Sequence, residues 1–137
     1  MIAERLTQGI MFREIKKVAQ KKGEGIRRWF EDDYFDLIIW YNTDKTIRGF
    51  QLCYDRYGDE HAFTWYSDLG YYHDKVHGED GRANLTPVLV ANGPFPGDSV
   101  LSEFTNSAQS LDDEIAELII EKLGDYIKKE NEKAHRR

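Results

Sequence analysis

Four short segments between Tyr34 and His77 constrain the fold of this chain more than any other feature of its sequence. They are rich in aromatic and β-branched residues, and polar turns such as "TDKT" and "YGDE" separate them. Such residues favour the pleated surface of a sheet, and short connections favour antiparallel pairing of consecutive strands. We therefore predict an antiparallel meander with strands at residues 34–42, 46–56, 61–67 and 71–77.

The remainder of the sequence predicts an edge strand and helices. Val88–Ala91 follows a proline, which restricts it to the edge of a sheet. An apolar stripe at helical spacing predicts a helix over residues 7–22, and a short helix is expected behind Asp98 or Ser99. Ser110 and Asp113 form a capping-box pattern before a long C-terminal helix. The predicted fold is thus α+β: an antiparallel meander of four to five strands, flanked by an N-terminal helix and one or two C-terminal helices.

Length and charge limit the class of protein. At 137 residues the chain is predicted to be a single domain, 1–137, in which 128–137 form a charged helix end or a frayed tail. The net charge of −6 disfavours nucleic-acid binding. The N-terminus has no secretory signal pattern, and no apolar run predicts a membrane span. Because Cys53 is the single cysteine, a reducing cytoplasmic location is expected.

The stretch "YYHDKVHGED" is the candidate ligand-binding or acid–base site. On a strand, His73 and His77 lie on one face but roughly 13 Å apart, too far to chelate one metal ion. A site is still possible if the "GEDG" turn brings a carboxylate back to His77. It is also possible if the strand register pairs His61 with a residue of the next strand. Otherwise the stretch is the polar face of a hairpin. The candidates are His61, His73, Asp74 and His77; no metal and no cofactor is predicted.

Other motifs are weaker. The sequence contains no phosphate-binding loop, nucleophile elbow or zinc-protease signature. Cys53 lies among apolar strand residues, which indicates a small core residue rather than a nucleophile. Asp32, Asp33 and Asp36 lack the spacing of a calcium loop and indicate a charged strand entrance.

Surplus aromatic surface suggests a function. A sheet with aromatic residues on both faces needs cover on both, and an uncovered patch is buried against a partner or a second copy. We therefore predict a non-enzymatic binding or interaction module that self-associates, with a homodimer as the expected assembly. The alternative is a small enzyme or ligand-binding protein with its site around His73 and His77. The predicted interaction surface is Trp29, Phe30, Trp40 and Trp65.

Three stretches, "RRWFEDDYFDLIIWYNTDKTIRGFQLCYD", "GYYHDKVHGEDG" and "TPVLVANG", resemble a family of small bacterial proteins without an assigned activity. The resemblance covers about residues 27–120. Its signposts are Trp29–Phe30, "FQLCYD" at 50–55, Gly70–His73 and "TPVLV" at 86–90. The resemblance implies a bacterial origin and one conserved domain shape, and it assigns no catalytic residue.

Overall fold

The structure is a computed structural model, and it describes residues 11–77, 88–91 and 95–135. The chain divides into two compact units. One is Glu14–Pro94, and the other combines Met1–Arg13 with Phe95–Arg137. The single domain stays a prediction, and each compact unit has its own architecture.

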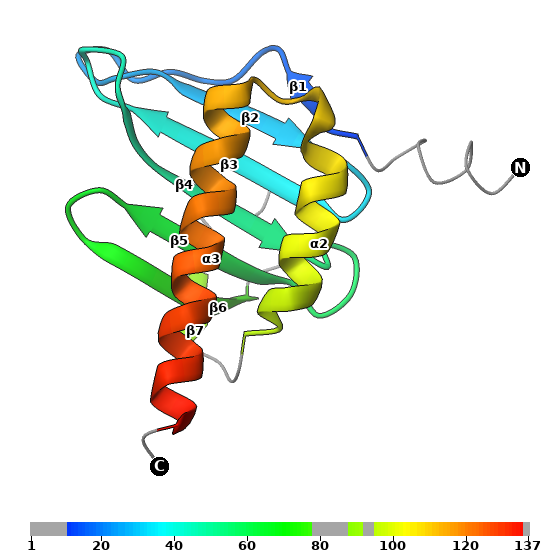
Figure 1. Cartoon of the computed structure of the whole chain (residues 1–137). Helices are drawn as coiled ribbons and strands as arrows, with labels where there is room; N and C mark the ends of the chain where they lie inside the picture. Colours follow the sequence, from blue (N-terminus) through cyan, green and yellow to red (C-terminus); the bar gives the residue numbers. More distant parts are fainter. Residues whose placement is uncertain (1–10, 78–87, 92–94, 136–137) are drawn as a thin grey trace, which may run out of the picture. The chain divides into compact units, whose positions relative to one another are not determined.

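A seven-stranded sheet whose spatial order equals the chain order builds the Glu14–Pro94 unit (Figure 1). From β2 to β7, each strand pairs antiparallel with the next. The predicted meander is confirmed, but the sheet has more strands than expected because β1 and β2 extend it on one side. The strands are β1 (Arg13–Ile15), β2 (Arg27–Glu31), β3 (Phe35–Tyr41), β4 (Ile47–Tyr54), β5 (His61–Tyr66), β6 (Gly70–His77) and β7 (Val88–Ala91).

The strand register separates an apolar face from a polar face. Leu37, Leu52 and Phe63 lie opposite one another on β3, β4 and β5, and all three are fully buried. The next pairs along the same strands repeat the pattern, so one face of the sheet carries a continuous set of large side chains. Its fully buried members are Phe35, Leu37, Ile39, Phe50, Leu52 and Phe63. Burial of this set provides the main hydrophobic stabilisation of the sheet.

Asp32 organises the turn between β2 and β3. Its Oδ1 accepts hydrogen bonds from the backbone N–H groups of Tyr34 at 2.8 Å and Phe35 at 2.6 Å. Its side chain is fully buried, and Oδ2 accepts no hydrogen bond within the described residues. Asp32 is thus an internal part of the hairpin. Asp32, Asp33 and Asp36 were predicted as charged residues at the start of a strand, and this describes Asp33, which is exposed just before β3.

The predicted N-terminal helix over residues 7–22 is wrong across its described part, residues 11–22. This stretch contains β1 and most of a loop that continues to β2 and includes Gly23, where φ is +87°. Arg28 of β2 explains the outcome, because its guanidinium donates to both carboxylate oxygens of Glu14, at 2.8 and 2.9 Å. This forked pair and the pairing of β1 with β2 outweigh a helical spacing of apolar residues. Residues 7–10 lie outside the described residues.

Two helices form the second unit: α2 (Gly97–Ser107) and α3 (Asp113–His135), joined by a 3₁₀ turn at Ala108–Ser110 (Figure 1). Both predicted helices are confirmed, and α3 extends into the stretch expected to be a helix end or tail. Gly97 has no room for a side chain, because a Cβ there would lie 2.3 Å from Cγ1 of Ile127. The start of α2 therefore packs directly against α3. No helix in the described ranges is apolar over enough length to cross a membrane.

The predicted cap of the C-terminal helix needs correction. Ser110 is not the N-cap, since it belongs to the 3₁₀ turn and the helix begins at Asp113. The Ser110 hydroxyl instead donates to the backbone oxygen of Phe12 at 3.0 Å. The Phe12 ring lies 5.8 Å from the Phe104 ring of α2. Phe12 is therefore held in the helical unit by a hydrogen bond and a ring contact.

Candidate ligand-binding cleft

The polar face of the sheet is best described as three rows of side chains that run across the strands. Residues within a row are direct pairing partners, and successive rows are two residues, or roughly 7 Å, apart along each strand. The first row is Arg27, Trp40, Gly49, Tyr66 and Gly70; the second is Trp29, Ile38, Gln51, Thr64 and Tyr72; the third is Glu31, Asp36, Cys53, Ala62 and Asp74.

The rows are hollowed near Gly49 and Thr64, which lie between larger residues on the neighbouring strands. Cys53 and Ala62 in the third row are buried and do not line the hollow. The result is a cleft with a volume of about 510 Å³. Its lining from the sheet and its turns is Arg27, Trp40, Arg48, Gln51, Thr64, Tyr66, Leu69, Tyr72 and Asp74; the segment 20–25 before β2 adds Gln20, Lys21, Glu24 and Gly25.

An aromatic pair forms one wall of the cleft. Trp40 and Tyr66 come from strands on either side of β4, yet their rings stack with centroids 5.3 Å apart and planes at 22°. They meet because Gly49 lies between them without a side chain. A Cβ at Gly49 would be 2.4 Å from the Trp65 carbonyl oxygen and 2.9 Å from Cδ1 of Tyr66. Burial raises the pKa of the Tyr66 hydroxyl, so it stays protonated at neutral pH.

The floor of the cleft is polar although it is almost fully buried. Gln51 is 4% exposed and Thr64 is 2% exposed. The Gln51 amide nitrogen donates to the Thr64 hydroxyl oxygen at 3.2 Å, and the Cys53 thiol donates to the Gln51 amide oxygen at 3.9 Å. An amide has two donor hydrogens and two acceptor positions, so these contacts orient Gln51 and leave part of its hydrogen-bonding capacity unused.

Charge is distributed unevenly around the cleft. Arg48 lies 5.9 Å from the Tyr66 ring centroid, near the first row, and Lys21 lines the cleft from the segment before β2. Asp74 stands in the third row, about 13 Å from the first along the strand. None of these three side chains forms an ion pair with another described residue. Glu24 lines the cleft from the same segment as Lys21, so the end near the first row has three cations, Arg27, Arg48 and Lys21, and one carboxylate. This net positive end is called the basic end, and the end at Asp74 is called the acidic end.

The segment before β2 is held in place by one glutamine. The Gln20 side chain accepts from the Arg27 backbone N–H and donates to the Arg27 backbone oxygen, both at 2.9 Å. Arg27 also donates from Nε to the Ala19 oxygen at 2.8 Å. At the other end of the segment Gly25 touches β3, where a Cβ would lie 1.8 Å from the Tyr41 oxygen. This segment therefore forms a fixed side of the cleft.

The structure separates the predicted site residues. His61 and His73 are neighbours on the apolar face, with ring centroids 5.4 Å apart, and the Tyr54 hydroxyl lies 2.6 Å from Nε2 of His73. Asp74 points to the opposite face and lines the cleft. The side chain of His77 and the "GEDG" turn lie outside the described residues. Among the described residues, no group of three His, Cys, Asp or Glu side chains could hold a metal ion.

The four aromatic residues predicted as an interaction surface have different environments. Trp40 lines the cleft. Phe30 is 5% exposed and packs under the Arg28 guanidinium, so it belongs to the core. Trp29 is half-buried and donates through its indole nitrogen to Asp36. Trp65 lies on the apolar face, 6.0 Å from the Phe50 ring.

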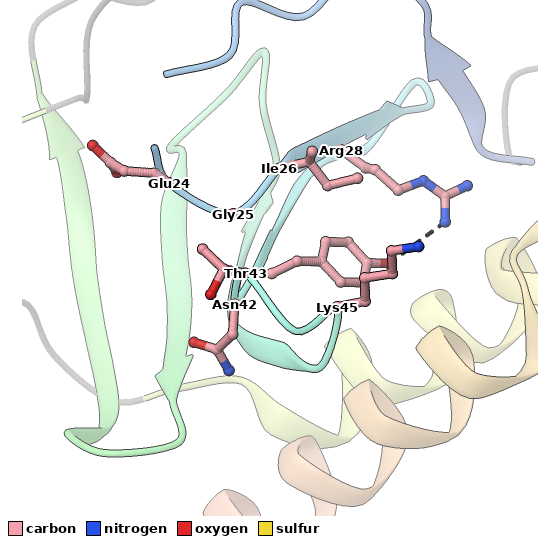
Figure 2. Close-up of a pocket in the computed structure, with 8 residues that line it drawn as sticks. Glu24, Gly25, Ile26, Arg28, Asn42, Thr43 and Lys45 are labelled. Carbon is pink, nitrogen blue, oxygen red and sulfur yellow. Dashed lines mark hydrogen bonds between the residues drawn. The ribbon is translucent and has the colours of Figure 1, made fainter. Parts of the chain in front are cut away.

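A second, smaller cavity of about 380 Å³ lies where β2 begins and β3 turns into β4 (Figure 2). Arg28 extends along this region (Figure 2), and its guanidinium donates to the Tyr41 hydroxyl at 3.5 Å. Because Glu14 already pairs with this guanidinium, the cavity offers less free charge than the cleft. The other lining residues are Glu24, Gly25, Ile26, Asn42, Thr43 and Lys45.

The cleft residues Arg48, Gln51, Thr64 and Tyr66 were not predicted as a site from the sequence. Single strands show them only as alternate polar or aromatic positions. Their common signal is small residues at matched positions of β4 and β5, which becomes visible only once the strand register is known.

Cys53 provides a prediction about the third row. Burial, followed by the negative charges of Glu60 and Asp36, raises the pKa of the Cys53 thiol well above its ordinary value. The reactive thiolate is therefore scarce at neutral pH. We expect a disulfide reagent such as dithiobis-nitrobenzoate to modify Cys53 in the native protein at least about a hundredfold more slowly than in denaturant. Equal rates in the two conditions would contradict this burial.

Comparison of the chain with protein-family models, with curated proteins and with solved structures found no match. The resemblance to small bacterial proteins therefore stays a prediction, and the function must be argued from the cleft.

Proposed function

We propose that this chain is a non-enzymatic binding module that holds a small, flat, polar molecule in the cleft on the polar face of its sheet. The observation that supports this most directly is the buried Gln51–Thr64 pair beneath an aromatic wall. Binding pockets combine aromatic surface with a few oriented polar groups in this way. The aromatic wall would stack on the ligand, and the amide and hydroxyl would fix its orientation.

The location of exposed apolar surface also supports ligand binding. The large hydrophobic side chains that are exposed in the described structure are Ile26, Tyr57, Leu69 and Tyr72. Leu69 and Tyr72 line the cleft and Ile26 lines the second cavity. Apolar surface gathered at cavities fits a small molecule better than it fits a broad protein interface. Self-association stays a prediction, and light scattering across a concentration series tests it.

The binding function predicts a thermal shift that depends on Trp40. A library of aromatic, heteroaromatic and aliphatic metabolites is screened for compounds that raise the unfolding midpoint. A ligand at about a hundred times its dissociation constant adds roughly 2.7 kcal/mol, which moves the midpoint by several degrees. We expect the shift to disappear in Trp40→Leu, which removes half of the aromatic wall.

Trp65→Leu is the matched control, because Trp65 is also half-buried but lies on the apolar face. It should unfold at a lower temperature than the wild type and still show the full ligand shift. A shift of equal size in both variants would place the ligand elsewhere, and a library without any hit would count against the proposal.

The Tyr54–His73 contact favours a second candidate function, acid–base catalysis. At 2.6 Å this hydrogen bond is short, and His61 stacks beside it with its Nδ1 within 2.8 Å of the Asp59 carbonyl oxygen. Such a group of hydroxyl and imidazoles can pass a proton. A panel of chromogenic esters and phosphoesters tests this with wild type and His73→Gln. Turnover lost in the variant supports it, and equal turnover in both contradicts it.

A further inference from the structure

We propose that the ligand of the cleft is a planar nitrogen heterocycle with an anionic group at one end and an amino group at the other, as in a purine nucleoside monophosphate. This inference rests on the binding function proposed above. It follows from the order of chemical groups along the cleft, which is cations, aromatic wall, amide and hydroxyl, and then carboxylate.

The basic end is suited to a phosphate group. Arg48 and Lys21 both line the cleft, and neither forms an ion pair with another described residue. A guanidinium binds a phosphate through two parallel hydrogen bonds, and an ammonium adds a point charge. Tyr66 stays neutral beside them because burial raises its pKa. The negative group that lines this end is the Glu24 carboxylate, and the cations Arg27, Arg48 and Lys21 outnumber it.

The aromatic wall and the floor are suited to a heterocyclic ring. The stacked pair of Trp40 and Tyr66 offers an extended flat surface, and base–aromatic stacking tolerates any heterocycle. One row further, Gln51 offers a donor and an acceptor side by side. An amide of this kind forms two hydrogen bonds with the amino group and ring nitrogen of adenine. The Thr64 hydroxyl lies 3.2 Å from the Gln51 nitrogen and holds this amide in place.

The acidic end selects a donor. Asp74 lines the cleft beyond Gln51 and Thr64, and no described residue forms an ion pair with it. Its carboxylate accepts hydrogen bonds and repels a carbonyl oxygen or a second phosphate. The first and third rows are about 13 Å apart, which leaves room for a sugar between ring and phosphate. An amino-bearing purine with a single phosphate therefore fits better than its keto counterpart.

Isothermal titration with four small molecules tests this assignment: adenosine monophosphate, inosine monophosphate, adenosine and ribose 5-phosphate. We expect adenosine monophosphate to bind most tightly. Adenosine, which lacks the phosphate, and ribose 5-phosphate, which lacks the ring, should each bind at least about tenfold more weakly. Inosine monophosphate, which replaces the amino group by oxygen, should bind about five- to tenfold more weakly.

Two variants assign these differences to residues. Arg48→Gln should lower the affinity for adenosine monophosphate towards that for adenosine, with Lys21 as the remaining phosphate-binding cation, and leave adenosine binding unchanged. Asp74→Asn should bind the two monophosphates with equal affinity, since an asparagine amide can donate to a carbonyl oxygen as readily as it accepts from an amino group. Lys45→Gln is the control, because this cation lines the second cavity and not the cleft; its affinities should match those of the wild type.

The outcomes separate this inference from the function on which it rests. If no nucleotide binds but the metabolite library still gives a shift that Trp40→Leu abolishes, the binding function stands and the ligand class is wrong. Equal affinity of wild type and Arg48→Gln for adenosine monophosphate also overturns the ligand class. If neither library nor nucleotides bind, both proposals fall.

Discussion

Replacement of Asp32 by alanine is expected to lower the free energy of unfolding of the Glu14–Pro94 unit by about 2–4 kcal/mol. The substitution removes the acceptor for the backbone N–H groups of Tyr34 and Phe35, which Asp32 bonds at 2.8 and 2.6 Å. The Phe35 contact is buried, so its N–H cannot turn to water when the acceptor is lost. The hairpin between β2 and β3 then carries unpaired groups in its interior.

Asp32→Asn is the matched control. Asparagine keeps the accepting oxygen, and it replaces the buried Oδ2, which has no hydrogen-bond partner within the described residues, by an uncharged group. We expect its stability to lie within about 1 kcal/mol of the wild type. Urea unfolding followed by tryptophan fluorescence measures both variants, because all three tryptophans lie in this unit. If alanine and asparagine destabilise equally, Oδ1 is not the group that stabilises the turn.

Gly49→Ala is expected to destabilise the same unit by about 2–3 kcal/mol and to disrupt the cleft. The new methyl group would lie 2.4 Å from the Trp65 carbonyl oxygen, which belongs to paired backbone on β5 and cannot withdraw without loss of ladder hydrogen bonds. It would also lie 2.9 Å from the Tyr66 ring. The stacked aromatic wall is therefore displaced, and the near-ultraviolet circular dichroism of the aromatic residues should change with the stability.

Gly124→Ala in α3 is the comparison, because a Cβ there meets no atom within 4 Å. Alanine is the better helix former, so this variant should gain about 0.5–1 kcal/mol in the helical unit. Far-ultraviolet circular dichroism during thermal unfolding measures it. The prediction for Gly49 fails if its alanine variant is as stable as the wild type with an unchanged aromatic spectrum.

The central strands and the C-terminal helices were predictable because local signals agree with the tertiary structure there. Aromatic and β-branched residues recur between turn residues in β3 to β6, and α3 carries an uninterrupted apolar stripe. The N-terminal helix was predicted wrongly because Met11, Ile15 and Val18 have helical spacing, whereas β1 lies beside β2 in the sheet and Glu14 pairs with Arg28, 14 residues further along the chain. β2 itself has few strand signals, since three of the five residues in "RRWFE" are charged and apolar residues do not alternate with polar ones.

The candidate site depended on information that single strands do not contain. The adjacency of His61 and His73, and the meeting of Gly49, Gln51 and Thr64 in one hollow, both follow from register. A slip of one residue on any strand would exchange the two faces and abolish both arrangements. Alternation along a strand predicts that Asp74 and His73 lie on opposite faces, and β6 places them so, which divides the residues named as one candidate site.

The spatial order of the strands, which follows the chain from β1 to β7, also bears on how the molecule is made. From β2 to β6 every pairing closes a loop of few residues, so each hairpin can form as soon as its second strand has left the ribosome. No strand has to wait for a partner from the far end of the chain. Such local connectivity lowers the contact order and favours rapid folding for a sheet of this size. Each strand edge therefore stays unpaired for only a short time during synthesis, which shortens the period in which the chain can aggregate through these edges.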